Sequence, residues 1–269
     1  MRDPSTIEWH GHRGCRGLLP ENSIPAFLHA IELGMDALEM DVVISKDKQV
    51  VIAHEPYMPA RICRLTDGQT ILPQDEQEHN LFRMDYETIR SYDCGLPHPD
   101  YPEQRAQSVH RPLLSELFDI VADRFPACGI RYTIELKSKE RTDNLFHPEP
   151  QEFVRLVLKE TERHGLTEDC LFQSFDIRIL EEFKQQAPRA RIAYLLQEPF
   201  QLQKALDRLS FKPDVLGPHF SLVDQDLVDA CHAMDIAVTP WTVNESEDID
   251  RMMKLGVDGI ITDYPNRKP

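Results

Sequence analysis

The fold is decided by HGHRGCRGLLPENSIPAFLHAIELGMDALEMDVVISKDKQVVIAHE, residues 10–55 of the chain. A short apolar run at 7–11 predicts a first strand, which His12-Arg13-Gly14 closes at the place where a site would begin. Pro20-Glu21-Asn22-Ser23 then opens a helix, because it offers a small polar residue for the N-cap, and Gly34 follows the helix end. The chain therefore begins with a strand and a helix.

A second strand is predicted at 37–43, and it carries two acidic residues. Side chains alternate between the two faces of a strand, so Glu39 and Asp41 share one face of an otherwise apolar element. Buried carboxylates persist mainly when they are paired or hold a metal, because an unpaired buried charge costs on the order of several kcal/mol. The alternative is that both side chains are solvated at a strand edge, and the pair alone leaves both interpretations open.

The segment that follows Asp41 is predicted to bring His54 close to the two carboxylates. Too few residues separate Asp41 from His54 for a parallel crossover, so an antiparallel hairpin is predicted. A two-residue turn at Asp47-Lys48 places Asp41 directly opposite His54. We therefore expect an imidazole beside the carboxylate pair.

These motifs resemble a known enzyme family. HRG, PEN, LEMDV, SKD and VIAHE are similar to the N-terminal signature of the glycerophosphodiester phosphodiesterase family, a PLC-like phosphodiesterase barrel. Further matches lie at Ile134–Lys137, Gln173–Asp176, Pro240–Asn244 and Gly259–Pro265, in order along nearly the whole chain. One departure is Lys48, where the family usually has glycine in the hairpin, and it should affect the turn more than the chemistry.

The resemblance implies a metal-dependent hydrolysis. Glu39, Asp41 and Glu135 would hold one divalent cation, and three carboxylates without a thiolate suit Mg²⁺ or Ca²⁺. His12 and His54 would act as general acid and base, since imidazole can do either near neutrality. The family reaction converts a glycerophosphodiester to an alcohol and glycerol 3-phosphate. Which histidine acts as the acid stays open, as does the choice between the two metals.

Three further residues are expected to bind the substrate. Arg13 and Lys137 can neutralise phosphoryl oxygens, where negative charge accumulates. Lys137 shares a strand face with Glu135, so a simple ion pair is its alternative role. Trp241 is expected to wall the pocket, with a core position as the alternative.

Two residues ahead of the first helix receive supporting roles. Glu21 is expected to orient Arg13 or His12 from behind the site. Asn22 is expected to cap the helix.

From Leu113 onwards helical and strand patterns alternate, which indicates a parallel sheet. Eight strands in about 250 residues predict a closed (β/α)8 TIM barrel, with a hairpin extension after strand 2 and an inserted cap at about 56–111, in a single domain over 1–269. Sites of this architecture lie at the C-terminal strand ends, where we place the following residues: His12, Glu39, Asp41, Glu135, Lys137, Ser174, Trp241 and Asp263. The expected strands begin near residues 7, 37, 131, 170, 191, 214, 237 and 259.

Composition limits the partners. The net charge of −16 argues against nucleic acid and anionic membranes, although a local cation can still attract a small phosphate ester. The sequence has no apolar run of about 18 residues and no apolar signal segment before the first strand, so no stable membrane insertion is expected. We therefore expect a small glycerophosphodiester as the partner and the cytoplasm as the compartment.

The six cysteines are scattered without a CxxC pair. This spacing suggests neither a zinc cluster nor a disulfide framework, so most of them are expected to be reduced, packed residues.

Two other functions stay open at this point. A lysophospholipase D acting on acylated glycerophosphodiesters would need an apolar groove in the cap. A metal-dependent binding module without turnover is the other alternative, and the presence of both histidines, three carboxylates and two cations argues against it.

Overall fold

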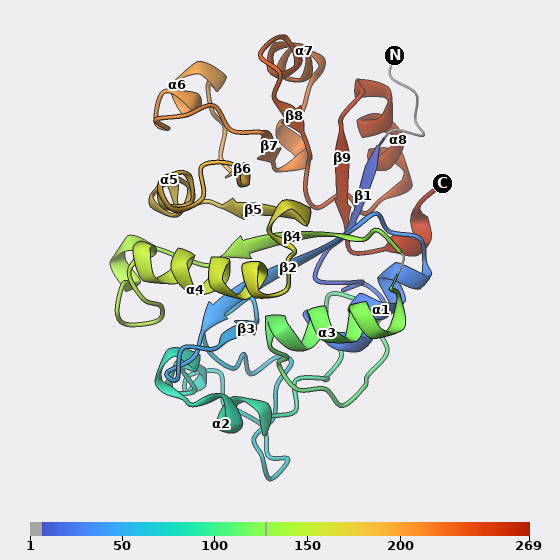
Figure 1. The fold of residues 1–269 in the computed structure, drawn as a ribbon. Helices are drawn as coiled ribbons and strands as arrows, with labels where there is room; N and C mark the ends of the chain where they lie inside the picture. Colours follow the sequence, from blue (N-terminus) through green and yellow to red (C-terminus); the bar gives the residue numbers. More distant parts are fainter. Residues whose placement is uncertain (1–6, 127) are drawn as a thin grey trace.

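The computed structural model describes residues 7–126 and 128–269. Outside the segment 56–111, strands and helices alternate along the chain and form one nearly closed barrel (Figure 1). The parallel strands are β1 (Glu8–Gly11), β2 (Ala37–Ile44), β4 (Arg131–Leu136), β5 (Cys170–Ser174), β6 (Arg191–Leu196), β7 (Val215–Pro218), β8 (Ala237–Val238) and β9 (Gly259–Thr262). The helices that accompany them are α1 (Ile24–Glu32), α3 (Leu114–Arg124), α4 (Pro150–Arg163), α5 (Ile177–Gln186), α6 (Leu202–Leu206), α7 (Gln225–Ala233) and α8 (Ser246–Leu255).

The strands follow the order β8-β7-β6-β5-β4-β2-β1-β9, and neighbours pair in parallel. Backbone hydrogen bonds also link the two ends of this order, from Asp258 N to Val238 O at 2.9 Å and from Ile261 N to Pro240 O at 3.0 Å. The result is a nearly closed barrel of eight parallel strands with helices outside. The predicted (β/α)8 TIM-barrel class is confirmed, and the strands begin within a residue of the predicted positions.

The main core lies between the barrel and its helices. Leu38 and Met40 of β2 are fully buried there, together with Ile134 of β4 and Phe172 of β5. The residues between them in sequence point into the barrel, because successive side chains of a strand alternate. On β2 and β4 these inward residues include Glu39, Asp41 and Glu135. The alternation of side chains along the strands therefore places three carboxylates inside the barrel.

One predicted strand is shorter than expected. The strand expected to begin near residue 237 lies in the sequence AVTPWTV, yet β8 covers only its first two residues. Beyond it, Thr239 N and Trp241 N still donate to Leu216 O and Pro218 O of β7, so the pairing continues as single hydrogen bonds. Pro240 has no backbone N–H, and its carbonyl oxygen accepts from Ile261 N of β9 at 3.0 Å.

Helix α1 is capped by Ser23, whose hydroxyl accepts a hydrogen bond from Ala26 N. The prediction that Asn22 caps this helix is therefore wrong. Asn22 adopts a φ of 55° and turns its side chain towards β2, where its Nδ2 donates to Asp41 Oδ2 at 2.9 Å. An asparagine tolerates this left-handed conformation better than most residues.

The hairpin of β2 with β3 (Val50–Ile52) has a different register from the predicted one. The turn contains three residues, 46–48, closed by a hydrogen bond from Ser45 N to Gln49 O, and Lys48 adopts a φ of 63°. Glycine adopts such a positive φ with less strain than lysine does, which is why glycine is favoured in turns of this kind. Because the turn is one residue longer, Ala53 and not His54 lies opposite Asp41, and Ala53 N donates to Asp41 O at 3.0 Å.

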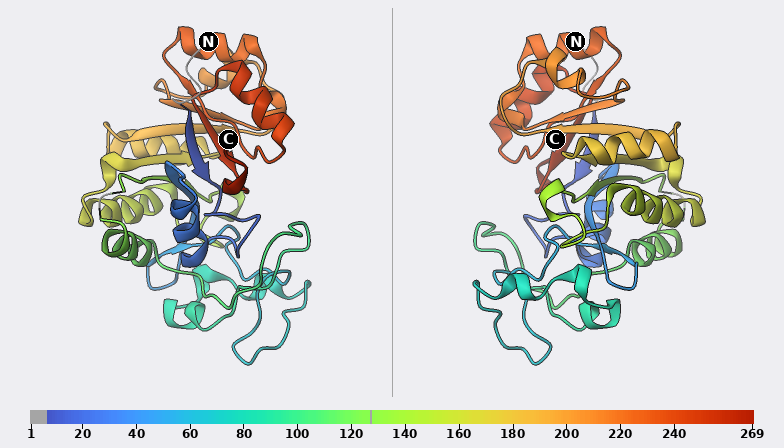
Figure 2. Two further views of the ribbon diagram at one scale, coloured as in Figure 1. Left: turned by 90° about the vertical axis from the view of Figure 1, so that its right-hand side faces the viewer. Right: turned by 90° about the vertical axis from the view of Figure 1, so that its left-hand side faces the viewer.

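The segment 56–111, called the insertion below, contains α2 (Tyr86–Arg90) and several short turns of helix. It lies beside β3 and α3 and opposite the half of the molecule that carries α7 and β8 (Figures 1 and 2). A second hydrophobic cluster fills it, and Val43 and Val51 of the hairpin join this cluster. Among the described residues, no helix has the length and apolar character that crossing a membrane requires.

The cysteines differ from expectation in one respect. Cys63 and Cys94 form a disulfide inside the insertion, so the expectation of reduced cysteines is wrong for this pair. Cys15, Cys170 and Cys231 are free and buried, as expected, and Cys128 is free and exposed. The disulfide joins two segments of irregular backbone, which no spacing rule in the sequence predicts.

Candidate active site

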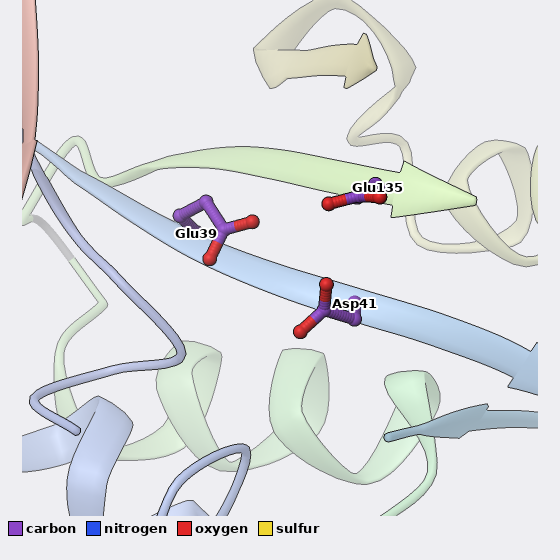
Figure 3. Close-up of side chains that lie close together, drawn as sticks. All are labelled: Glu39, Asp41 and Glu135. Atoms are coloured by element: carbon purple, nitrogen blue, oxygen red, sulfur yellow. The ribbon is translucent and has the colours of Figure 1, made fainter. Parts of the chain in front are cut away.

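Three buried carboxylates converge at the C-terminal ends of two neighbouring strands. Glu39 and Asp41 extend from β2, Glu135 extends from β4, and the three carboxylates point toward one another (Figure 3). The parallel register places Asp41 beside Glu135. One oxygen of each residue lies within 4.8 Å of the others. The structure therefore brings together the three residues that the resemblance assigns to a metal.

The charges of this cluster are only partly compensated by protein groups. Burial, with the like charges of Asp41 and Glu135, raises the pKa of Glu39 well above its usual value. Burial also raises the pKa of Glu135 to about 7, although Lys137 opposes this shift. Asp41 behaves differently: burial opposes its ionisation, but the charges of Arg13 and Lys137 hold its pKa well below the usual range. The positive charge nearby thus compensates Glu135 only in part and Glu39 least of the three.

The donor set fits a hard divalent cation. Carboxylate oxygens bound to one Mg²⁺ or Ca²⁺ at about 2.0–2.6 Å can be no more than about 4–5 Å apart, which the cluster satisfies. One oxygen of Asp41, Oδ1, is buried without a hydrogen-bond partner. In the described part of the chain, the only side-chain nitrogen of a basic residue within 4.0 Å of Glu39 is Nε2 of His12, at 3.8 Å. The cluster can therefore hold a metal ion.

Two cations flank the cluster. Arg13 Nε lies 3.1 Å from Asp41 Oδ2, and its NH1 donates to Glu21 Oε1 at 3.0 Å. Lys137 Nζ donates to Glu135 Oε1 at 2.7 Å and lies 3.5 Å from Asp41 Oδ1. Glu21 thus contacts Arg13, one of the two partners considered for it, and Lys137 makes the ion pair considered as its alternative role. The backbone N of Arg13 also donates to Glu39 at 3.0 Å.

His12 is held by a carboxylate from the last strand of the barrel. Its Nδ1 lies 2.6 Å from Asp263 Oδ1, which follows β9, because β1 and β9 pair in parallel. An Nδ1–H donated to this oxygen leaves Nε2 free on the side of Glu39. Burial lowers the pKa of His12, and the charge of Asp263 opposes that shift.

His54 follows β3, and the carboxylate of Glu55 lies beside its ring, although Nδ1 has no hydrogen-bond partner among the described residues. Its Nδ1 lies 3.1 Å from Glu55 Oε1, which Arg61 contacts at 2.6 Å. Burial, with the charges of Arg13 and Lys137, lowers the pKa of His54 to about 4, while the charge of Asp41 raises it. His54 is therefore close enough to Asp41 to feel its charge, although it is not the paired residue of the hairpin.

A cavity of about 970 Å³ opens beyond the cluster, at the ends of β4, β5 and β6. His54, Glu135 and Lys137 line it, so it leads directly from the carboxylates. Its other walls come from several loops and the insertion and mix polar and charged side chains with aromatic rings, which include Tyr57, Phe146, Phe175 and Phe200. Trp241 is not among its described lining residues; the indole contacts Phe175 at 5.5 Å between ring centroids and donates to Gly217 O.

Several residues of the site received no role from the sequence. The sequence places Asp263 near the barrel mouth, but it does not show that Asp263 contacts His12, because that contact depends on the register of β1 with β9. Gln173, which donates to Glu39 Oε1 at 2.9 Å, stands in the QSFD match and could have been proposed from it. Arg16 contacts Glu21 at 2.6 Å, and its only signal was its nearness to His12 in the sequence.

Comparison with known proteins gives a consistent result. The sequence profile of the glycerophosphoryl diester phosphodiesterase family matches residues 12–267. The chain is 31% identical over 258 residues to a glycerophosphodiester phosphodiesterase of Caldanaerobacter subterraneus, covering 94% of this chain and 93% of the relative. It is 28% identical to a lysophospholipase D of Mus musculus, covering 95% and 83% of the two chains.

Solved structures show the same likeness. A Silicibacter pomeroyi structure assigned to the glycerophosphoryl diester phosphodiesterases has a TM-score of 0.89 and 33% identity, covering 98% of this chain and 92% of that one. An Oleispira antarctica phosphodiesterase in complex with the product sn-glycerol-3-phosphate has a TM-score of 0.76 at 22% identity, covering 98% and 95%, and shows the fold alone. The chain therefore belongs to the glycerophosphoryl diester phosphodiesterase family and is a phosphodiester hydrolase.

Proposed function

We propose that this hydrolase converts glycerophosphodiesters, such as glycerophosphocholine or glycerophosphoethanolamine, to an alcohol and glycerol 3-phosphate. The observation that carries the proposal is the convergence of three buried carboxylates with two imidazoles, each backed by a carboxylate. The Oleispira antarctica phosphodiesterase, whose fold this chain shares, is described with sn-glycerol-3-phosphate as its product. Glu39, Asp41 and Glu135 would hold one Mg²⁺ or Ca²⁺.

The cation, when bound, supplies positive charge next to the phosphoryl oxygens. Lys137 lines the cavity beside Glu135 and can contact a phosphoryl oxygen directly, because its ammonium has three donors and Glu135 uses one. Arg13 is buried and engaged by Glu21 and Asp41. Arg13 therefore stabilises the negative charge of the phosphate without contacting it, because electrostatic attraction is weakly screened in a buried site.

The two histidines would move the protons. One removes the proton from the attacking oxygen, of the glycerol hydroxyl or of water, as the new P–O bond forms, and the other protonates the departing alkoxide as the old P–O bond breaks. Attack by the glycerol hydroxyl gives a cyclic phosphate, which water then opens to glycerol 3-phosphate. His54 lines the cavity that would receive the alcohol, so we assign it to the leaving oxygen and His12 to the attacking oxygen. A bound phosphodiester anion would oppose the lowering of the pKa of His54 and favour its protonated form.

Separate variants test the proposed proton transfer by the histidines and the proposed metal binding by the carboxylates. His12→Asn and His54→Asn should each lower turnover of glycerophosphocholine by about 10²–10⁴-fold. Both should still bind Mg²⁺ or Ca²⁺ in calorimetry. Glu135→Gln should weaken that binding, because it removes a ligand charge. His29→Asn, a control on helix α1 whose imidazole contacts Glu32 at 3.2 Å away from the site, should keep full activity. Full hydrolysis by metal-stripped protein in excess chelator would contradict the proposal.

A second candidate substrate class has its own observation. A cavity of about 530 Å³ lies in the insertion and shares Glu55 and Tyr57 with the main cavity, and its apolar walls include Ile71 and Leu72. An acylated glycerophosphodiester would need an apolar surface of this kind for its chain, and the mouse relative is a lysophospholipase D, which supports this second class. Comparing lysophosphatidylcholine with glycerophosphocholine tests it, since Leu72→Ser should slow only the acylated substrate.

A further inference from the structure

We propose that Tyr101 of the insertion is a positioning residue for catalysis, which holds Asp263 and, through it, His12 in the reactive orientation. The inference rests on the proposed acid–base role of His12. The Tyr101 hydroxyl donates to Asp263 Oδ2 at 3.2 Å, while Asp263 Oδ1 contacts His12 Nδ1 at 2.6 Å. The two oxygens of one buried carboxylate thus connect the insertion to the imidazole.

The orientation of Asp263 depends on what its second oxygen contacts. Asn244 Nδ2 donates to Oδ2 at 2.8 Å, and Asn244 Oδ1 accepts a hydrogen bond from the backbone N of Asp263 at 2.9 Å. Asn244 lies in the loop that follows β8, so the barrel itself supplies one donor. Tyr101 supplies the second donor from outside the barrel. With Oδ2 fixed by two donors, the carboxylate cannot rotate about its last bond without losing one of them, and the plane of the imidazole is fixed in turn.

Tyr101 is itself tied to the loop that carries His12. Its segment forms a compact turn, with Gln104 N donating to Tyr101 O at 3.0 Å. The side chain of Gln104 donates to the carbonyl oxygens of Arg16 and Leu19, and Arg105 N donates to Leu18 O. The phenol therefore moves with the segment after β1 and not independently of it.

The ring of Tyr101 is packed without the help of its hydroxyl. The Arg16 guanidinium lies 4.7 Å from the ring centroid. The His98 ring packs edge to face with the Tyr101 ring, with 5.1 Å between the two ring centroids. Arg16 also pairs with Glu21, which pairs with Arg13 beside Asp41. A phenylalanine at position 101 keeps these ring contacts and removes one hydrogen bond. The substitution therefore separates positioning of Asp263 from packing of the insertion.

Tyr101→Phe should lower kcat for glycerophosphocholine on the order of tenfold, as loss of an orienting partner typically does. KM, the affinity for Mg²⁺ or Ca²⁺ and the melting temperature should stay close to those of the wild type. Tyr92→Phe is the matched control, because this insertion tyrosine also loses one hydroxyl contact, with His79 Nδ1 at 2.9 Å, away from the site. It should leave kcat unchanged.

Proton NMR gives a measurement that does not depend on turnover. The His12 Nδ1 proton in its short hydrogen bond with Asp263 should give a downfield resonance that is absent in Asp263→Asn and shifted in Tyr101→Phe. Wild-type kcat and an unshifted resonance in Tyr101→Phe would overturn the inference, as would an equal loss of kcat in Tyr92→Phe. If the wild type hydrolyses no glycerophosphodiester, the proposed function fails, while the resonance still tests whether Tyr101 orients His12.

Discussion

His10 shows how strongly the barrel interior acts on a single titratable residue. Its side chain is buried, and Nδ1 lies 2.9 Å from Thr133 Oγ1 of β4, which is two strands away. Burial, with the nearby charge of Arg131, lowers the pKa of His10 from 6.5 to about 3. Nε2 lies 3.4 Å from Glu8, whose own pKa is raised by burial, so this contact does not reverse the shift. The folded protein therefore keeps His10 neutral where the unfolded chain would protonate it.

This difference predicts a dependence of stability on pH. Since the folded pKa lies below the unfolded one, the contribution of neutral His10 is complete above about pH 6.5 and is lost as the pH falls towards 3. At pH 5 the loss should be about 2 kcal/mol. Urea unfolding of wild type and His10→Asn measures it, because asparagine can replace Nδ1 but does not titrate. His29→Asn should keep the wild-type pH dependence, and an equally steep loss in His10→Asn would contradict the prediction.

At the same scale, the sequence predicted which residues meet but not every contact. Alternation along β2 was sufficient to place Glu39 and Asp41 on one face, since it depends only on the pleat. The position of His54 depended on the turn, and the left-handed conformation of Lys48 added one residue to it. The contact of His12 with Asp263 spans 251 positions and needs the register of two strands at opposite ends of the chain.

The ends of the helices differ in a way that has measurable consequences. Gly34, Gly165 and Gly256 follow the last turns of α1, α4 and α8 with φ values of 77°, 70° and 75°. After α7 this position is occupied by Asp235, with a φ of 53°. A side chain there strains the backbone, and a carboxylate near a helix C-terminus also opposes the helix dipole.

Asp235→Gly should therefore stabilise the protein by about 1 kcal/mol, which corresponds to about 2–4 °C in melting temperature. The lost contact with Lys212, at 4.0 Å on the surface, should matter little. Gly256→Asp is the reverse experiment, because an added Cβ meets no atom within 4 Å there and only the backbone is strained. A destabilised Asp235→Gly protein in thermal denaturation would show that its side chain does more than the structure indicates.

For the elements as a whole, apolar periodicity located the strands and most of the helices correctly. Local patterns are sufficient where each strand is apolar and each helix has one apolar face, because these decide which side is buried. They failed at β8, where the regular strand ends after two residues and only single hydrogen bonds to β7 continue beyond it. They also could not reveal the fold of the insertion, whose backbone is largely irregular.

In the described part of the chain, the two larger hydrophobic cores are joined by the β2–β3 hairpin. Val42 and Ile52 pack in the barrel core, while Val43 and Val51, on the opposite face, pack in the insertion. One face of the hairpin thus belongs to the barrel core and the other face to the core of the insertion. The disulfide between Cys63 and Cys94 lies in the smaller of the two cores. Loss of this bond should therefore act on the insertion first.

The double variant Cys63→Ser, Cys94→Ser should loosen the insertion while the barrel stays folded. A loop of 31 residues is worth about 3–4 kcal/mol in the chain-entropy account of a disulfide, a large share of what a small core can supply. Hydrogen exchange should accelerate in peptides from 56–111 and stay unchanged in β4, β5 and β6. Cys128→Ser, which removes an exposed free thiol, should exchange like the wild type. If the double variant unfolds everywhere in one transition, the two cores are a single cooperative unit, and the insertion cannot loosen on its own.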